Sequence, residues 1–94
     1  MLSENVRESI RELARKCGIR KVVLFGSRAR GDNGSLSDID LAVWGGNVVE
    51  FRTSIDDVVP TLLMFDVVNM ESKISDRLRE NVQREGKLLY DAES

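Results

Sequence analysis

Histidine is absent from the 94 residues, and cysteine, proline and tryptophan each occur once. Without histidine the chain lacks the most common zinc ligand and the usual general base at neutral pH. A bound metal ion would therefore have oxygen ligands, which favours Mg²⁺, Mn²⁺ or Ca²⁺. Because Cys17 has no second cysteine to pair with, we expect a reducing, cytoplasmic location.

Long hydrophobic runs and a large charge of one sign are also missing. No apolar stretch approaches the roughly 20 residues of a membrane-spanning helix, and the N-terminal residues are too acidic for a signal peptide. The net charge of −2 is not that of a nucleic-acid-binding chain. We expect residues 1–94 to form one domain with a modest core and no direct contact with membrane or nucleic acid.

Hydrophobic periodicity predicts two helices in the first two thirds of the chain. Ser3 is the expected N-cap of the first helix. The second covers residues 47–57, where Asn47 and Glu50 match a loose capping box and Pro60 forces the chain out of the helix. The apolar stripe of the first helix consists of Val6, Ile10, Leu13, Ala14 and Cys17. This stripe predicts that Cys17 is a buried, unreactive thiol.

A last helix is predicted with Ser72 as its N-cap and Gly86 at its end. Its buried face is expected to consist of Ile74, Leu78 and Val82. Its arginines, Arg77, Arg79 and Arg84, are expected on a solvated face. Residues 87–90 then predict a short strand or an ordered tail.

Three runs of β-forming residues predict strands at residues 21–25, 38–44 and 62–69. The long polar connection allows the first two to pair antiparallel, and the helix after the second allows it to pair parallel with the third. The expected fold is α/β (α+β), a small mixed sheet flanked by helices. Trp44 and Phe51 are expected in the core or against a partner.

A polar segment, GSRARGDNGSLSDID, joins the first two predicted strands. If these strands are antiparallel, Gly26 and Ser27 at the exit of one meet Asp38 and Asp40 at the entrance of the other. Backbone N–H groups at a glycine can cradle phosphate oxygens because no side chain blocks the approach. Arg28 is close enough in sequence to add a phosphate contact.

Asp38 and Asp40 are two residues apart on a strand, so their side chains share one face, with α-carbons about 6.6 Å apart. Carboxylates in this arrangement can bind one metal ion or bridge two. Asp66 interrupts the third apolar strand, where a carboxylate is costly to bury unless it meets a cation. Together these residues predict a metal-dependent site for a nucleoside triphosphate.

The same residues partly match other motifs. Residues 26–31 have the glycine spacing of a P-loop, but residues 32–33 lack the required Lys-Ser/Thr. Ala42 and Val43 occupy positions where an EF-hand needs an oxygen ligand and a glycine. A haloacid-dehalogenase aspartate pair follows a strand, whereas this pair opens one. Asp66 taken alone could be a strand-edge charge facing solvent.

The ordered set of Gly-Ser, ten residues, Asp-x-Asp and a later strand aspartate resembles the polymerase-β-like nucleotidyltransferase superfamily. The stretch GSRARGDNGSLSDIDLAV is similar to the minimal nucleotidyltransferases of prokaryotes, and the resemblance covers nearly the whole chain. It implies that Gly26 and Ser27 hold the β- and γ-phosphates of ATP or another nucleotide. Asp38 and Asp40 would bind two Mg²⁺ ions, with Mn²⁺ as an alternative. Asp66 would bind the catalytic metal and help activate the acceptor hydroxyl.

The same resemblance implies a partner. Members of this group are usually paired with a helical HEPN-domain protein, in several cases as antitoxin and toxin, and some transfer AMP to a tyrosine of it. Two hypotheses follow, an enzyme that transfers AMP to a protein hydroxyl and a non-catalytic antitoxin that neutralises a HEPN partner by binding. Transfer to a small molecule such as an aminoglycoside is a third, less favoured hypothesis. The oligomeric state stays open, including a homo-oligomer.

Overall fold

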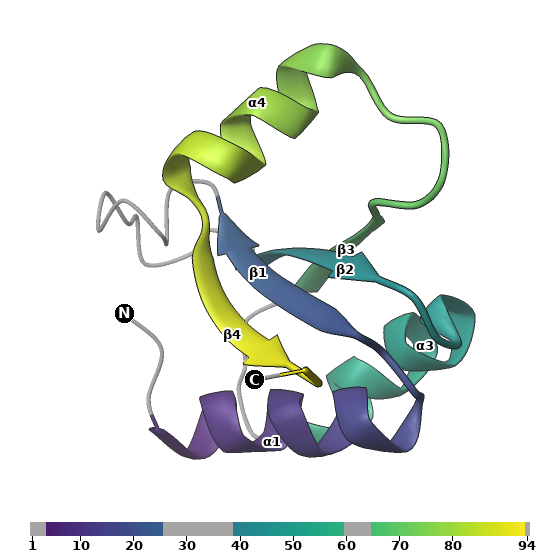
Figure 1. Ribbon diagram of the computed structural model, residues 1–94. Coiled ribbons are helices and arrows are strands. Elements are labelled where there is room, and N and C mark those ends of the chain that lie inside the picture. Colours follow the sequence, from purple (N-terminus) through teal and green to yellow (C-terminus); the bar gives the residue numbers. More distant parts are fainter. Residues whose placement is uncertain (1–3, 26–38, 60–64, 94) are drawn as a thin grey trace.

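The computed structural model of the chain describes residues 4–25, 39–59 and 65–93, and these form a four-stranded mixed sheet with helices on both faces (Figure 1). The strands lie in the order β3-β2-β1-β4. Strand β1 is antiparallel to both neighbours, while β2 and β3 are parallel. This confirms the predicted mixed sheet and the predicted direction of its first three strands. The strands are β1 Lys21–Phe25, β2 Ile39–Trp44, β3 Phe65–Asn69 and β4 Lys87–Asp91.

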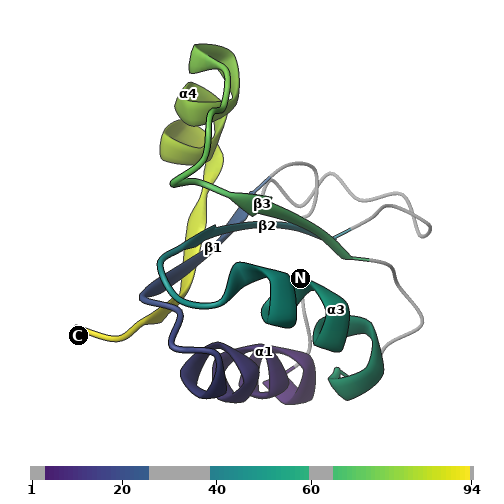
Figure 2. The same cartoon turned by 90° about the vertical axis from the view of Figure 1, so that its right-hand side faces the viewer.

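The helices divide between the two faces of the sheet. Helices α1 (Glu4–Lys16) and α3 (Val48–Val58) cover one face, and α4 (Asp76–Glu85) rises from the other (Figure 2). Ser3, Pro60 and the first residues of the predicted second and third strands, Asp38 and 62–64, lie outside the described residues. No helix in the described part of the chain is both long enough and apolar enough to cross a membrane.

Two clusters of apolar side chains, one on each face, hold the layers together. The larger cluster joins α1 and α3 to the sheet, and Phe51, Ile10 and Leu41 within it are fully buried. The smaller cluster lies under α4, where Val82 packs with Val23 and Ala42. Val82 is the one fully buried residue of α4, so this helix is held by far less apolar contact than α1.

Local signals explain where α3 begins and ends. The side-chain oxygen of Asn47 accepts a hydrogen bond from the backbone N–H of Glu50 at 3.1 Å, and the Asn47 amide donates to the Glu50 carboxylate at 3.2 Å. The predicted N-cap role of Asn47 is therefore confirmed, but the reciprocal half of a capping box is absent, because the backbone N–H of Asn47 donates to the backbone oxygen of Cys17 at 2.8 Å. After Val58 the chain becomes extended at Val59 (φ −85°, ψ 125°), as expected for a residue before proline.

The predicted start of the last helix was wrong. Ser75, not Ser72, is the N-cap of α4, and its hydroxyl accepts from the backbone N–H of Leu78 at 3.1 Å. The Ser72 hydroxyl instead donates to the backbone oxygen of Asn69 at 2.7 Å, within the turn after β3. Ile74 consequently precedes the helix, although it packs half-buried against the smaller cluster as predicted.

The C-terminal end of α4 and the last strand follow the predictions. Gly86 ends the helix, and β4 extends one residue beyond the predicted 87–90 to pair with β1. A β-carbon on Gly86 would lie 2.3 Å from the backbone oxygen of Val82 and 2.4 Å from Cγ1 of Val23. Glycine is therefore required here because the helix end lies directly on β1.

Candidate active site

Asp40 on β2 and Asp66 on β3 lie beside each other, as paired positions of the two parallel strands. Asp40 comes two residues before Ala42, and Asp66 comes two residues before Val68. Ala42 and Val68 belong to the cluster under α4. Because side chains alternate along a strand, both aspartates therefore point to the α4 face of the sheet. Neighbouring strands are about 4.8 Å apart, so the two carboxylates can reach a shared ligand.

The two aspartates differ in their surroundings. Asp40 is half-buried on an interior strand, between Phe25 on β1 and Asp66 on β3. Asp66 is exposed on the edge strand β3. The predicted cost of burying Asp66 is therefore absent, while its carboxylate is open to a ligand arriving from solvent.

The rest of the predicted site lies outside the described residues. This applies to Gly26, Ser27, Arg28 and Asp38. The described chain stops at Phe25 and resumes at Ile39, and Phe25 is paired with Asp40. The polar segment therefore leaves from the C-terminal end of β1 and returns at the N-terminal end of β2, the strand ends near which Asp40 and Asp66 lie.

The donor chemistry of the described pair fits a hard cation. Two carboxylates supply the oxygen ligands that Mg²⁺ and Mn²⁺ prefer. Residues 4–25, 39–59 and 65–93 contain no group of three or more acidic, histidine or cysteine side chains able to hold a metal ion. A complete metal site would therefore need a further ligand from substrate, water or the segment that carries Asp38.

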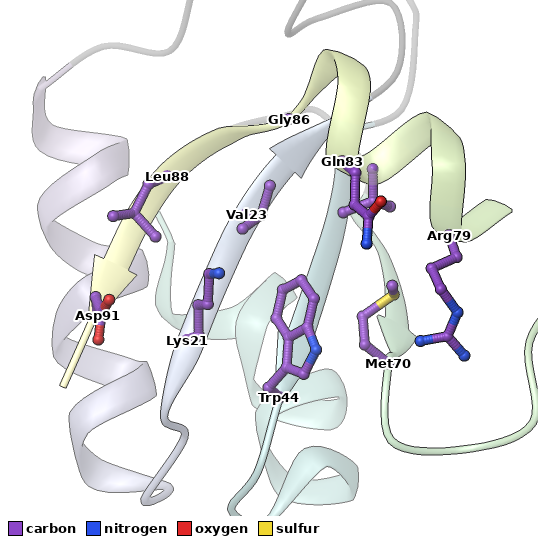
Figure 3. A pocket seen from close by; sticks show the side chains of 10 residues that line it. Lys21, Val23, Trp44, Met70, Arg79, Gln83, Gly86, Leu88 and Asp91 are labelled. Carbon is purple, nitrogen blue, oxygen red and sulfur yellow. The ribbon is translucent and has the colours of Figure 1, made fainter. Parts of the chain in front are cut away.

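A separate cavity of about 520 Å³ lies on the same face of the sheet, toward the other end of β2. Figure 3 shows Trp44 on its floor between Lys21 and Met70, with Arg79 and Gln83 projecting from α4. The Lys21 ammonium lies 5.0 Å from the centre of the indole ring. Neither Asp40 nor Asp66 lines this cavity.

The sequence patterns did not predict this cavity. Arg79 is exposed, as are Arg77 and Arg84, which confirms the predicted solvated face of the last helix, and Arg79 also lines the cavity. The alternation of β1, which puts Lys21 on the face of Val23 and Phe25, was the available signal. Trp44 is half-buried beside the smaller cluster, which agrees with the predicted core or partner contact.

A Gly45–Glu71 contact fixes the loop that leads from β3 to α4. The Glu71 carboxylate accepts from the backbone N–H of Gly45 at 2.8 Å and also pairs with the Arg20 guanidinium. Met70 just before it donates its N–H to the backbone oxygen of Val43 at 2.8 Å. The loop is thus tied to the end of β2, which keeps α4 on the face of the candidate site.

The mixed sheet with helices on both faces is the fold expected of a nucleotidyltransferase. Residues 8–94 match the family described as polymerase beta, nucleotidyltransferase. The chain belongs to this family, and it is a nucleotidyltransferase by that membership.

Three proteins to which this chain is similar are described below. MJ0604 of Methanocaldococcus jannaschii, provisionally named a protein adenylyltransferase, is 38% identical over 81 residues, covering 77% of this chain and 79% of that protein. A solved toxin–antitoxin structure with AMP-PNP is 26% identical with a TM-score of 0.75, over 92% of this chain and 73% of the other. A solved, provisionally named minimal nucleotidyltransferase is 30% identical with a TM-score of 0.68, over 86% of both chains.

Proposed function

We propose that residues 1–94 act as one catalytic domain that transfers AMP from ATP to a hydroxyl group of a protein partner. In this proposal the chain is the cytoplasmic antitoxin of a pair whose toxin is a helical HEPN-domain protein. The main support for the proposal is the pairing of Asp40 with Asp66 close to the strand ends that the Gly-Ser segment connects. The adenylyltransferase name of MJ0604 and the toxin–antitoxin complex with AMP-PNP support the nucleotide and the partner.

In the proposed site, one group of residues would bind the triphosphate and another would bind the metal ions. Gly26 and Ser27, with Arg28, would hold the phosphates, while Asp38, Asp40 and Asp66 would hold two Mg²⁺ ions. When bound, these ions would neutralise the charge that develops on the triphosphate.

The exposure of Asp66 gives a protein hydroxyl access to its carboxylate, which would orient the hydroxyl and accept its proton. The hydroxyl oxygen forms a bond to the α-phosphorus of ATP. At the same time the bond between the α-phosphorus and the oxygen that bridges to the β-phosphate breaks, and pyrophosphate leaves.

Label transfer from α-³²P-ATP with Mg²⁺ tests this proposal. The acceptor is the cognate partner, sought as a short all-helical protein encoded beside this chain. Asp40→Asn and Asp66→Asn should each reduce labelling about a hundredfold or more, because each removes a charged metal ligand. Asp57→Asn is the matched control, since Asp57 is exposed on α3, the helix against the opposite face, and should leave labelling unchanged.

The competing function is neutralisation by binding alone. The similar toxin–antitoxin structure is compatible with it, because a complex can form without chemistry. If the wild-type chain neutralises its partner without transferring label, and Asp40→Asn neutralises equally well, the enzyme proposal is wrong and the binding function replaces it.

A further inference from the structure

A side chain of helix α3 binds a backbone oxygen of β3, the edge strand that contains Asp66. Nη2 of Arg52 on α3 donates to the backbone oxygen of Val67 at 3.0 Å. Val67 directly follows Asp66 in the chain, and its own side chain is buried in the larger core cluster. Arg52 therefore fixes β3 from the side that β2 does not occupy.

The opposite edge of the sheet has the same arrangement. Nε of Arg11 on α1 donates to the backbone oxygen of Leu89 on β4 at 2.9 Å. Each edge strand thus has a carbonyl oxygen bound by an arginine of the helical layer, which also reduces its availability to another strand. The two edges differ in one respect, because β4 carries none of the residues assigned to the candidate site.

We propose that Arg52 is a positioning residue for Asp66. The proposal rests on the proposed function, since it assigns Arg52 to the same metal site. Asp66 and Val67 point to opposite faces, so Arg52 acts on the carboxylate through the backbone of β3 rather than by contact. A charge-assisted hydrogen bond to the Val67 carbonyl holds the Val67–Val68 peptide, one residue beyond Asp66, and so helps to keep β3 in register with β2. Without it, an edge strand with a partner on one side only would let the two carboxylates drift apart.

The direction in which metal affinity changes when Arg52 is replaced distinguishes a positioning role from a purely electrostatic one. Arg52 is a cation near a site that binds cations, so removing its charge alone would strengthen metal binding. Loss of the hydrogen bond to Val67 would weaken metal binding, because Asp66 would no longer be held at the distance that a shared ion requires. A weaker site after removal of a positive charge is therefore specific to positioning.

The test measures Mn²⁺ binding to the full chain in the presence of AMP-PNP, by calorimetry or electron paramagnetic resonance. Arg52→Met keeps most of the side-chain length but removes the donor and the charge, and it should weaken Mn²⁺ binding about tenfold, the equivalent of about 1.4 kcal/mol. Arg52→Lys keeps a donor and should recover part of this loss. In label transfer, Arg52→Met should lower kcat and leave KM for ATP unchanged.

Arg11→Met is the matched control, because it removes the corresponding hydrogen bond at the β4 edge. It should leave Mn²⁺ affinity and kcat unchanged. Unchanged or tighter Mn²⁺ binding in Arg52→Met, or an equal loss in Arg11→Met, overturns the proposal. A wild-type chain that binds Mn²⁺ but transfers no label contradicts the proposed enzyme, and the metal affinities then still decide the role of Arg52. A wild-type chain that binds no Mn²⁺ overturns both.

Discussion

Asp40 and Asp66 occupy directly paired positions on parallel strands, with their side chains on the same face of the sheet. Like charges in adjacent strand positions repel, by about 0.2–1 kcal/mol in comparable pairs. Asp66→Asn should therefore raise the free energy of unfolding in metal-free buffer by a few tenths of a kcal/mol. Urea unfolding with EDTA, followed by circular dichroism, measures this change.

In metal-free buffer Asp66→Asn should be more stable than the wild-type chain, and adding Mg²⁺ and AMP-PNP should make the wild-type chain the more stable of the two. The wild-type chain should gain stability as the ligand concentration exceeds its dissociation constant, while Asp66→Asn should gain much less. Asp57→Asn changes an exposed carboxylate on α3, the helix against the opposite face of the sheet, and should follow the wild type in both buffers. Equal stabilisation of wild type and Asp66→Asn by Mg²⁺ and AMP-PNP would argue against a metal-ligand role for Asp66.

The sheet could be predicted from sequence because its strands carry strong local signals. Three of the five residues 21–25 are β-branched or aromatic, and the helix of residues 48–58 is long enough to connect parallel strands. That topology predicted Asp40 and Asp66 on two parallel strands, while their directly paired register is a finding of the structure. Arg52 could not be found in the same way, because its hydrogen bond to Val67 depends on how α3 packs against the sheet edge. Side-chain patterns carry no signal for a contact made to a backbone oxygen.

The error at Ser72 has a local physical cause. Serine is a good residue for both a turn and a helix N-cap, and the sequence offers Ser72 and Ser75 three positions apart. The turn after β3 uses Ser72, because Asn69 ends the strand with its backbone oxygen available to that hydroxyl. The helix can then begin only after the chain has left the turn, which makes Ser75 the cap.

This difference predicts unequal effects of two similar substitutions. Ser75→Ala should destabilise the protein by about 1 kcal/mol, because the backbone N–H of Leu78 loses its acceptor. Ser72→Ala should cost less, since an exposed turn hydrogen bond contributes about 0.5 kcal/mol and can be replaced by water. Urea unfolding of both variants measures the difference. A larger effect at Ser72 would contradict the assigned helix start.

Cys17 gives the fold a predicted pH dependence. The thiol is 8% exposed at the end of the α1 stripe. Burial raises its pKa, and the negative charge of Glu50 raises it further. A raised pKa means that the folded chain holds the thiol proton more tightly than the unfolded chain. The stability from this effect is complete below the unfolded pKa of about 8.5 and is lost as pH rises through the higher folded pKa.

Unfolding measured by urea between pH 7 and pH 10 tests this expectation. The wild-type chain should lose stability above about pH 8.5, and Cys17→Ala should show a smaller loss over the same interval, even though its cavity lowers stability at every pH. The native thiol should also react slowly with a thiol reagent at pH 8, and rapidly after unfolding. Identical pH dependence in the two chains would contradict the assigned burial effect.

The contact of Gly86 with β1 predicts that α4 depends on a residue without a side chain. In Gly86→Ala, the new methyl group would collide with the backbone oxygen of Val82 and with Val23, so α4 would have to shift. Because Val82 is the one buried residue of α4, with Leu78 only partly buried beside it, we expect a loss of about 1–3 kcal/mol. The tryptophan fluorescence should also change, since Trp44 is the chain's one tryptophan and lies in the cavity beneath α4. Glu80→Ala, an exposed substitution on the same helix, should leave both stability and fluorescence close to wild type. A Gly86→Ala chain with wild-type stability and fluorescence would show that α4 is not held against β1 in the way described.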